Sequence, residues 1–290
     1  MNASDLNEMA DNVWYVEGSM LDRFLNGDFS LGPSYSNKIL LAVNKPVLTD
    51  TVNSVSAARM ILGANIEVCE LEVPLRLQGE IKKDGTAGGI VFGWKELVEQ
   101  VRPYSFDALA ISTPIEVSRD VKLHYYKHGG TNPWGRVEAM ASGLISKELN
   151  RPVAHSPSED WALLSKEDPE LFDWNEPVDP RIAAEMVSVS YMFCMLKGLH
   201  RAPRIGKGIS NKDVTCVFLP HGCAGIPEDI CRDKDIPLYI VDDNKTCLDK
   251  PAPKASHIKS YLEAAGILQS YRAGIDWKYT KRPIPRTKIF

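Results

Sequence analysis

The chain has 290 residues, 44% of them hydrophobic and 25% charged, a composition typical of a globular protein. Its formal net charge is −4 and its pI is about 5.9, so it has no overall basic field to hold nucleic acid or an anionic membrane. We therefore expect the protein to bind neither nucleic acid nor a membrane surface. In addition, no apolar run approaches the roughly 18–20 residues that span a bilayer.

The N-terminus, MNASDLNEMADN, is polar and acidic, the opposite of a secretory signal peptide. The six cysteines show no C-x-x-C spacing, which favours reduced thiols over a disulfide framework. These features predict a cytoplasmic protein. The basic C-terminal segment KYTKRPIPRTKIF is expected to be a solvated arm or a contact in a homo-oligomer.

Strand-like runs alternate with helical segments along most of the chain. Several runs are continuously apolar, as expected for strands that are covered on both faces. The predicted strands are Lys38–Val43, Ile66–Val73, Asp107–Thr113, Pro152–His155, Val214–Pro220 and Ile236–Asp242. The predicted helices are Asp50–Gly63, Gly135–Asn150, Asp179–Gly198 and Ala255–Gly266.

This alternation predicts an α/β fold with a mainly parallel sheet flanked by helices, Rossmann-like or doubly wound. We expect a single α/β domain over residues 1–290, with sub-lobes at 1–150 and 151–275 around a cleft and a tail at 276–290. A glycine-rich loop or hairpin is expected at residues 82–93, and a long acidic, aromatic loop at 156–180.

Polar residues of catalytic type follow several predicted strands, at Ser112–Thr113, His155–Ser156, His221 with Cys223, and Asp242–Thr246. Ligands of open parallel sheets bind beyond the carboxyl ends of the strands. If these strands are neighbours, their ends converge on one crevice.

The stretch FLPHGCAG combines an imidazole and a thiol with two glycines. His221 is a candidate general acid or base, and the alternative is a structural histidine that caps a helix or forms hydrogen bonds within a turn. Cys223 is a candidate nucleophile, or else a small apolar residue. The backbone N–H groups at Gly222 and Gly225 are candidates for binding an anion, and a tight turn is the alternative.

Asp242 lies 20 residues after Gly222, near the spacing at which dinucleotide sites place a ribose-binding acid. The pattern is G-x-x-G rather than G-x-G-x-x-G, however, and Pro227 interrupts the expected helix start. Asp243 and Asn244 extend the polar group at this strand end. The cofactor therefore stays open, with a dinucleotide and a divalent metal as alternatives and neither assigned.

The loop HGGTNPWG leads directly into a predicted helix, a pattern typical of anion sites. Thr131 and Asn132 are candidate donors or caps, and Arg136 could hold a carboxylate with two hydrogen bonds. Glu138 is a candidate base or a residue that matches the helix dipole. His155 follows at the end of the next strand, beside Ser156.

Two groups of residues offer metal ligands, but the sequence assigns no metal site to either. His124 and His128 are four residues apart, but the β-rich sequence KLHYYKH and the following glycines argue against a helix there. His155, His221 and Asp242 could form a site across loops, which spacing alone does not test.

Four segments together resemble the domain-of-unknown-function family numbered 3326: NASDLNEMADNVWYVEGSMLDRFLNG, NPWGRVEAMASGLISKELNRPVAHSP, LHRAPRI, and IPLYIVDDNKTCLD with YLEAAGIL. The resemblance covers nearly the whole chain but implies no assigned activity. It also implies a further N-terminal strand and glycine-rich loop, before the segment at which this chain begins.

We therefore expect an enzyme that acts on a small anionic metabolite by general acid/base chemistry, as an isomerase, lyase or hydrolase. His155 and His221 would transfer protons across a shared pocket. The alternatives are a non-catalytic nucleotide- or metabolite-binding protein and a structural subunit.

Overall fold

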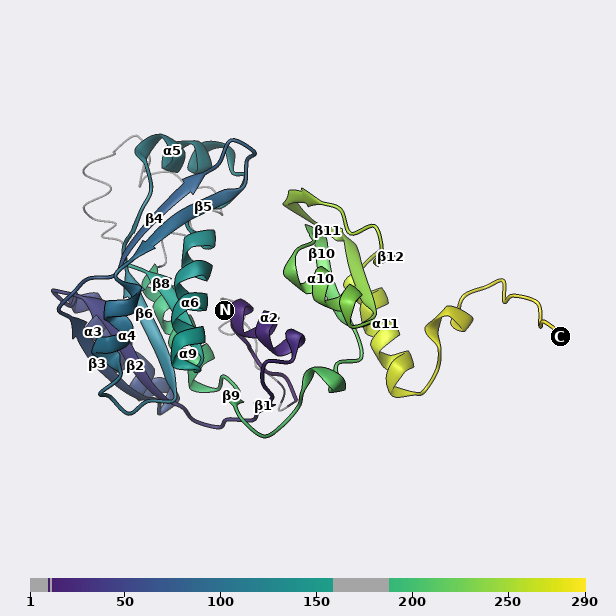
Figure 1. Ribbon diagram of the computed structural model, residues 1–290, viewed down its shortest axis with the longest axis horizontal. Coiled ribbons are helices and arrows are strands. Elements are labelled where there is room, and N and C mark those ends of the chain that lie inside the picture. The colour runs from purple at the N-terminus through teal and green to yellow at the C-terminus, as the bar shows by residue number, and fades with distance from the viewer. Residues whose placement is uncertain (1–9, 11, 159–187) are drawn as a thin grey trace. The chain divides into compact units, whose positions relative to one another are not determined.

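The computed structural model describes residue 10, residues 12–158 and residues 188–290. The chain forms two compact units, Met1–Lys212 and Asp213–Phe290, here called unit 1 and unit 2 (Figure 1). The sequence predicts a single α/β domain with sub-lobes meeting near residue 150, which stays a prediction; the boundary between the two compact units lies after Lys212. The reason is that the strand and helix after residue 150 pack within unit 1.

Unit 1 is built around a four-stranded parallel sheet in the order β3-β2-β6-β8. A three-stranded sheet, β5-β4-β7, and a short antiparallel pair, β1-β9, accompany it. The strands are β1 Leu31–Gly32, β2 Lys38–Asn44, β3 Asn65–Leu71, β4 Arg76–Ile81, β5 Ala87–Phe92, β6 Ala108–Thr113, β7 Ile115–Glu116, β8 Val153–Pro157 and β9 Arg204–Ile205. The helices are α2 Gly18–Asn26, α3 Thr49–Leu62, α4 Trp94–Val101, α5 Arg119–His128, α6 Gly135–Leu149, α9 Ser188–His200 and the 3-10 turn Asn211–Asp213 at the boundary.

Helices cover both faces of the four-stranded sheet. On one face, α4 and α6 supply buried residues such as Leu97 and Ile145. On the other face, α3 and α9 supply Val55 and Leu196. Strand β6 is buried along its whole length, which explains its continuously apolar sequence. The predicted α/β class with a mainly parallel sheet is thus confirmed.

Unit 2 holds a three-stranded parallel sheet in the order β10-β11-β12. Helix α11 packs on it through Ala264 and Ile267, against Tyr239 and Val241 of β11. The elements are β10 Val217–Cys223, α10 Ile226–Asp233, β11 Leu238–Lys250, β12 Ser256–Ile258, α11 Tyr261–Arg272 and the 3-10 turn Trp277–Thr280.

Three local predictions differ from the structure. Residues Arg119–His128 form a helix rather than a strand, because Tyr126 and neighbouring Trp134 bury their rings on one side of it. Residues Ser256–Ile258 form strand β12, so the predicted helix from Ala255 begins only at Tyr261. Strand β10 continues through Cys223, where a glycine loop was expected.

Other predictions fall partly outside the described residues. The glycine-rich stretch at residues 82–93 forms the turn and second strand of the β4–β5 hairpin, as one alternative predicted. The loop expected at 156–180 and the helix start expected at Asp179 lie mostly or wholly in residues that the structure does not describe.

Candidate functional site

Unit 1 joins a hydroxyl, an imidazole and a carboxylate at the carboxyl ends of β6 and β8. Thr113 is the last residue of β6, His155 lies on β8, and Glu138 is in the first turn of α6. The Thr113 Oγ1 lies 2.9 Å from His155 Nε2, and His155 Nδ1 lies 3.0 Å from Glu138 Oε1. We call these three residues the Thr113 relay.

The direction of the hydrogen bonds in the relay follows from the carboxylate. An ionised Glu138 only accepts, so His155 donates from Nδ1 and its Nε2 accepts the Thr113 hydroxyl proton. Both the Thr113 residue and the His155 side chain are fully buried, while the Glu138 side chain is 26% exposed. In this arrangement His155 can act as a base that takes the Thr113 hydroxyl proton, while the Glu138 carboxylate holds the imidazole in position.

Three buried polar atoms at the ends of β6 and β8 and at the start of α6 have no hydrogen-bond partner among the described residues. Ser112 and Ser156 are register partners on β6 and β8, next in sequence to Thr113 and His155, and each hydroxyl is unpaired. The indole Nε1 of Trp134, at the start of α6, is unpaired as well. Because native proteins pair nearly all buried polar atoms, such orphans mark places that need an explanation.

The loop before α6 uses its polar side chains for structure. Thr131 Oγ1 donates to the Gly85 carbonyl at 2.9 Å, and Asn132 Oδ1 accepts from the N–H groups of Trp134 and Gly135 at 2.9 and 3.0 Å. Thr131, Asn132 and Arg136 were expected to bind an anion here. Thr131 and Asn132 are half-buried, whereas Arg136 is exposed to solvent.

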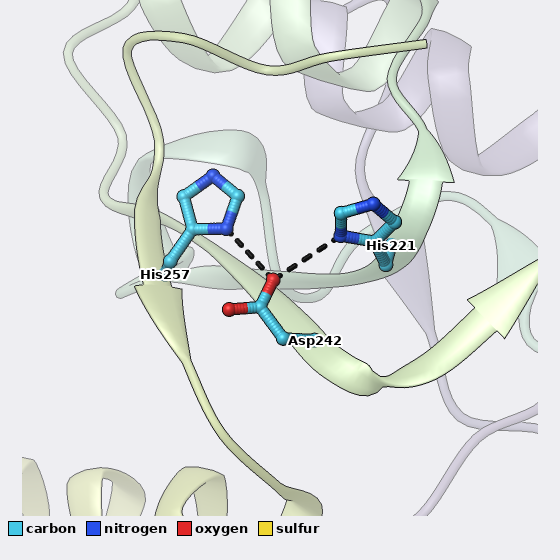
Figure 2. Close-up of side chains that lie close together, drawn as sticks. All are labelled: His221, Asp242 and His257. Carbon is cyan, nitrogen blue, oxygen red and sulfur yellow. Dashed lines mark hydrogen bonds and ion pairs between the residues drawn. The ribbon is translucent and has the colours of Figure 1, made fainter. Parts of the chain in front are cut away.

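Unit 2 brings two imidazoles to one carboxylate oxygen, as Figure 2 shows. Asp242 Oδ1 lies 3.2 Å from His221 Nδ1 and 2.8 Å from His257 Nδ1. The three residues come from the adjacent parallel strands β10, β11 and β12, with Asp242 on the central one. We call them the His-Asp-His cluster.

The His-Asp-His cluster is open to solvent. Its side chains are 40%, 43% and 47% exposed in the order His221, Asp242 and His257. Hydrogen bonds from His257 and then His221 hold the pKa of the Asp242 carboxyl below its usual range, so this group stays ionised at neutral pH. One potential ligand atom from each residue lies within 4.8 Å of the others, so these residues could hold a metal ion.

The glycines near His221 have structural roles. Gly222 has φ +81°, and a Cβ there would lie 1.8 Å from the Leu248 carbonyl oxygen, so close backbone approach demands glycine. Gly225 precedes α10, in which Pro227 occupies the first turn and is compatible with the helix. The Cys223 thiol lies 3.7 Å from Thr246 Oγ1 and is half-buried.

The remaining predicted polar residues lie beside the cluster on β11. The Asp243 N–H donates to the Lys259 carbonyl at 3.0 Å, and Asn244 Nδ2 donates to the Tyr261 hydroxyl at 2.7 Å. Asp242 itself is occupied by two imidazoles, an arrangement different from the ribose contact that its spacing from Gly222 indicated.

The structure thus assembles the predicted residues into two groups. His155 joins Glu138 in unit 1, whereas His221 joins Asp242 in unit 2, and the pocket expected to unite His155 with His221 stays a prediction. Sequence analysis missed His257, because the segment around it was assigned to a helix. Neither the sequence nor the burial of Ser256, His257 and Ile258 alternates, so the local pattern carried no strand signal.

Two further features include none of the residues of either group. His124 and His128 stack along α5 with ring centroids 5.0 Å apart, so they share a helix face after all. A cavity of about 620 Å³ in unit 2 is lined by Tyr239, Tyr271 and Trp277 among others, and its lining includes none of the His-Asp-His cluster.

With both sites described, the comparisons define the class of this protein. The model of the family described as "Protein of unknown function (DUF3326)" matches residues 1–281, and the chain belongs to this family. An uncharacterized lipoprotein of a Synechococcus strain is 30% identical over 298 aligned positions, which cover 95% of this chain and 80% of that protein.

A solved structure, the apo form of D-lactate dehydrogenase from Escherichia coli, aligns with 15% identity and a TM-score of 0.20. The alignment covers 76% of this chain and 61% of the dehydrogenase. A TM-score this low does not support a common fold. Within the described residues, no helix combines the length and apolar character needed to cross a membrane.

Proposed function

We propose that this protein is an enzyme that acts on a small anionic metabolite by general acid/base chemistry, with the Thr113 relay at its centre. One observation carries the proposal: Thr113, His155 and Glu138 are linked by hydrogen bonds of 2.9 and 3.0 Å at the carboxyl ends of parallel strands. In open parallel sheets, this edge is where ligands bind.

The proton path follows from the hydrogen bonds. In a hydrolase, His155 Nε2 takes the Thr113 hydroxyl proton as that oxygen attacks the substrate, Glu138 stabilises the resulting imidazolium, and the proton passes to the leaving group as its bond breaks. Water that enters after the leaving group departs is deprotonated by His155, cleaves the bond to Thr113 and restores the hydroxyl. In a lyase or isomerase no bond to the protein forms: the Thr113 hydroxyl accepts a substrate proton while passing its own to His155, and that proton then goes to the leaving group or to another atom of the substrate.

Polar groups at the same edge of the sheet support a bound ligand. The unpaired hydroxyls of Ser112 and Ser156 lie at the ends of the same two strands, but on the opposite face of the sheet from Thr113 and His155, because side chains alternate along a strand. Arg136, exposed in the first turn of α6, supplies a positive charge at the helix start that also carries Glu138, although residues two positions apart leave a helix on different sides. Burial excludes water from the relay and strengthens its hydrogen bonds, and it requires a substrate to displace the side chains that cover Thr113.

The test compares two substitutions of the same kind. Wild-type protein, His155→Gln and His200→Gln are incubated with pools of phosphorylated and carboxylated metabolites, and substrate loss is followed by proton NMR. His200 is also a buried histidine but lies at the end of α9, outside the relay. Turnover should fall about 10²–10⁴-fold in His155→Gln and stay near wild type in His200→Gln.

Two results would contradict the proposal: equal turnover in wild type and His155→Gln, or equal losses in both variants. Thermal stabilisation by a metabolite without any turnover would instead favour the non-catalytic binding protein. A ligand at 100 times its dissociation constant adds about 2.7 kcal/mol of stability, which a thermal-shift assay detects.

Cellular location and oligomeric state remain predictions. The composition favours a cytoplasmic protein, whereas the relative named a lipoprotein raises a lipid-anchored form as the alternative. Fractionation of cells into soluble and membrane pools distinguishes them.

Light scattering of the purified protein tests the homo-oligomer, for which the exposed apolar residues of the C-terminal tail, Ile289 and Phe290, are the expected contacts.

A further inference from the structure

The His-Asp-His cluster has no part in the chemistry proposed for unit 1. Its three side chains come from neighbouring strands and converge on Asp242 Oδ1, with the rings of His221 and His257 centred 6.4 Å apart (Figure 2). We propose that His221, Asp242 and His257 form a binding site for a divalent transition-metal ion such as Zn²⁺.

The distances come close to those of a metal site. Metal–ligand bonds of about 2.0–2.2 Å in a tetrahedral site place neighbouring ligand atoms about 3.3–3.6 Å apart. The two nitrogen–oxygen separations are 3.2 and 2.8 Å, and all three ligand atoms lie within 4.8 Å of one another. Binding one ion requires the imidazole nitrogens to come closer together, and we expect rotation of these exposed side chains to provide this.

The ligand set selects the class of ion. Two imidazole nitrogens and one carboxylate oxygen suit zinc and its first-row neighbours, whereas calcium and magnesium prefer sites made entirely of oxygen. The ion takes the place of the two Nδ1 protons that point at Asp242, and each neutral ring then carries its proton on Nε2.

The number and exposure of the ligands indicate an open coordination sphere. Structural zinc sites close the metal with four protein ligands, but this cluster offers three, all between 40% and 47% exposed. Water or an anionic ligand fills the remaining positions. An ion held in this way lowers the pKa of its bound water to about 7 and can polarise an anion.

Zinc binding is measured on the full chain, freed of any affinity tag and stripped with a chelator. ZnCl₂ is titrated calorimetrically into the wild type, His257→Gln, His221→Gln and His124→Gln. The last is a matched control, because His124 and His128 form an exposed helical pair that could bind metal by itself. In parallel, NMR follows the imidazole resonances of His221 and His257.

We expect the wild type to bind one equivalent of Zn²⁺, with both cluster imidazoles shifted. Each cluster variant should weaken binding by about 100-fold or more, since even groups that only support ligands contribute 10–100-fold. His124→Gln should bind as the wild type does. Circular dichroism checks folding, and if one cluster variant unfolds the other decides.

No uptake of Zn²⁺ by the wild type would overturn the inference, and so would unchanged affinity in a folded cluster variant. Loss of binding in His124→Gln alone would assign the metal to α5 instead. None of these outcomes affects the Thr113 relay, because the titration measures the metal alone and the relay belongs to unit 1.

Discussion

Asn37 joins the end of α9 to the start of β2, and replacing it by alanine should destabilise unit 1 severely. Its side chain is fully buried, and its Nδ2 donates to the carbonyls of Leu199 and Ala202 at 2.8 and 2.9 Å. Its Oδ1 accepts from the Ser34 hydroxyl and from Arg204 Nε, each at 2.7 Å.

The expected loss follows from these four bonds. Each neutral hydrogen bond contributes about 0.5–1.5 kcal/mol, and the guanidinium bond somewhat more. Asn37→Ala should therefore lower the free energy of unfolding of unit 1 by roughly 3–5 kcal/mol. For a unit of about this size, that loss corresponds to a fall of roughly 6–20 °C in Tm.

Two further variants sharpen the test. Asn37→Asp keeps the shape but turns a carboxylate oxygen towards the carbonyl oxygens of Leu199 and Ala202, so it should lose at least as much stability as Asn37→Ala. The control is Asn26→Ala, because the exposed Asn26 makes one hydrogen bond, to Asp28, and its loss should cost about 0.5 kcal/mol or less.

Urea unfolding followed by hydrogen-exchange mass spectrometry separates the two units, since peptides from each report their own transition. The reasoning is refuted if Asn37→Ala loses less than about 1 kcal/mol, or if unit 2 shifts as much as unit 1.

Three further predictions concern unit 2. Gly222→Ala should destabilise it by about 2–4 kcal/mol in urea, because the new Cβ meets the Leu248 carbonyl oxygen at positive φ; an unchanged midpoint would count against this. Tyr239→Phe should lower stability by about 1–3 kcal/mol in urea, since the Trp277 indole N–H loses its 2.9 Å acceptor. A lysine side chain and then a backbone N–H depress the pKa of Glu263, so its stabilisation is present above about pH 4.5 and declines as pH falls through the lowered pKa. Urea midpoints at several acidic pH values should therefore fall less steeply in Glu263→Gln than in the wild type.

The local sequence was sufficient to predict the elements of the main sheet. The apolar run at Lys38–Val43 and the one ending at Thr113 are continuous because both faces of these strands are covered by helices, and this pattern is visible without the fold. The same reasoning predicts polar side chains at strand ends, among them His155, and the glycine loop before a helix predicts Glu138 in its first turn.

The tertiary structure decided which strand ends are neighbours. Thr113 reaches His155 across 42 positions of sequence, and His257 reaches Asp242 across 15, because strand pairing sets these contacts and no local periodicity encodes it. The boundary after Lys212 arises in the same way, since β8 pairs with β6 and keeps residues beyond 150 in unit 1. The sequence by itself therefore determined the strands of the main sheet and the residue types at their ends, but not helix α5 or strand β12. Long-range pairing decided which of these residues meet, as a relay in unit 1 and a histidine–aspartate cluster in unit 2.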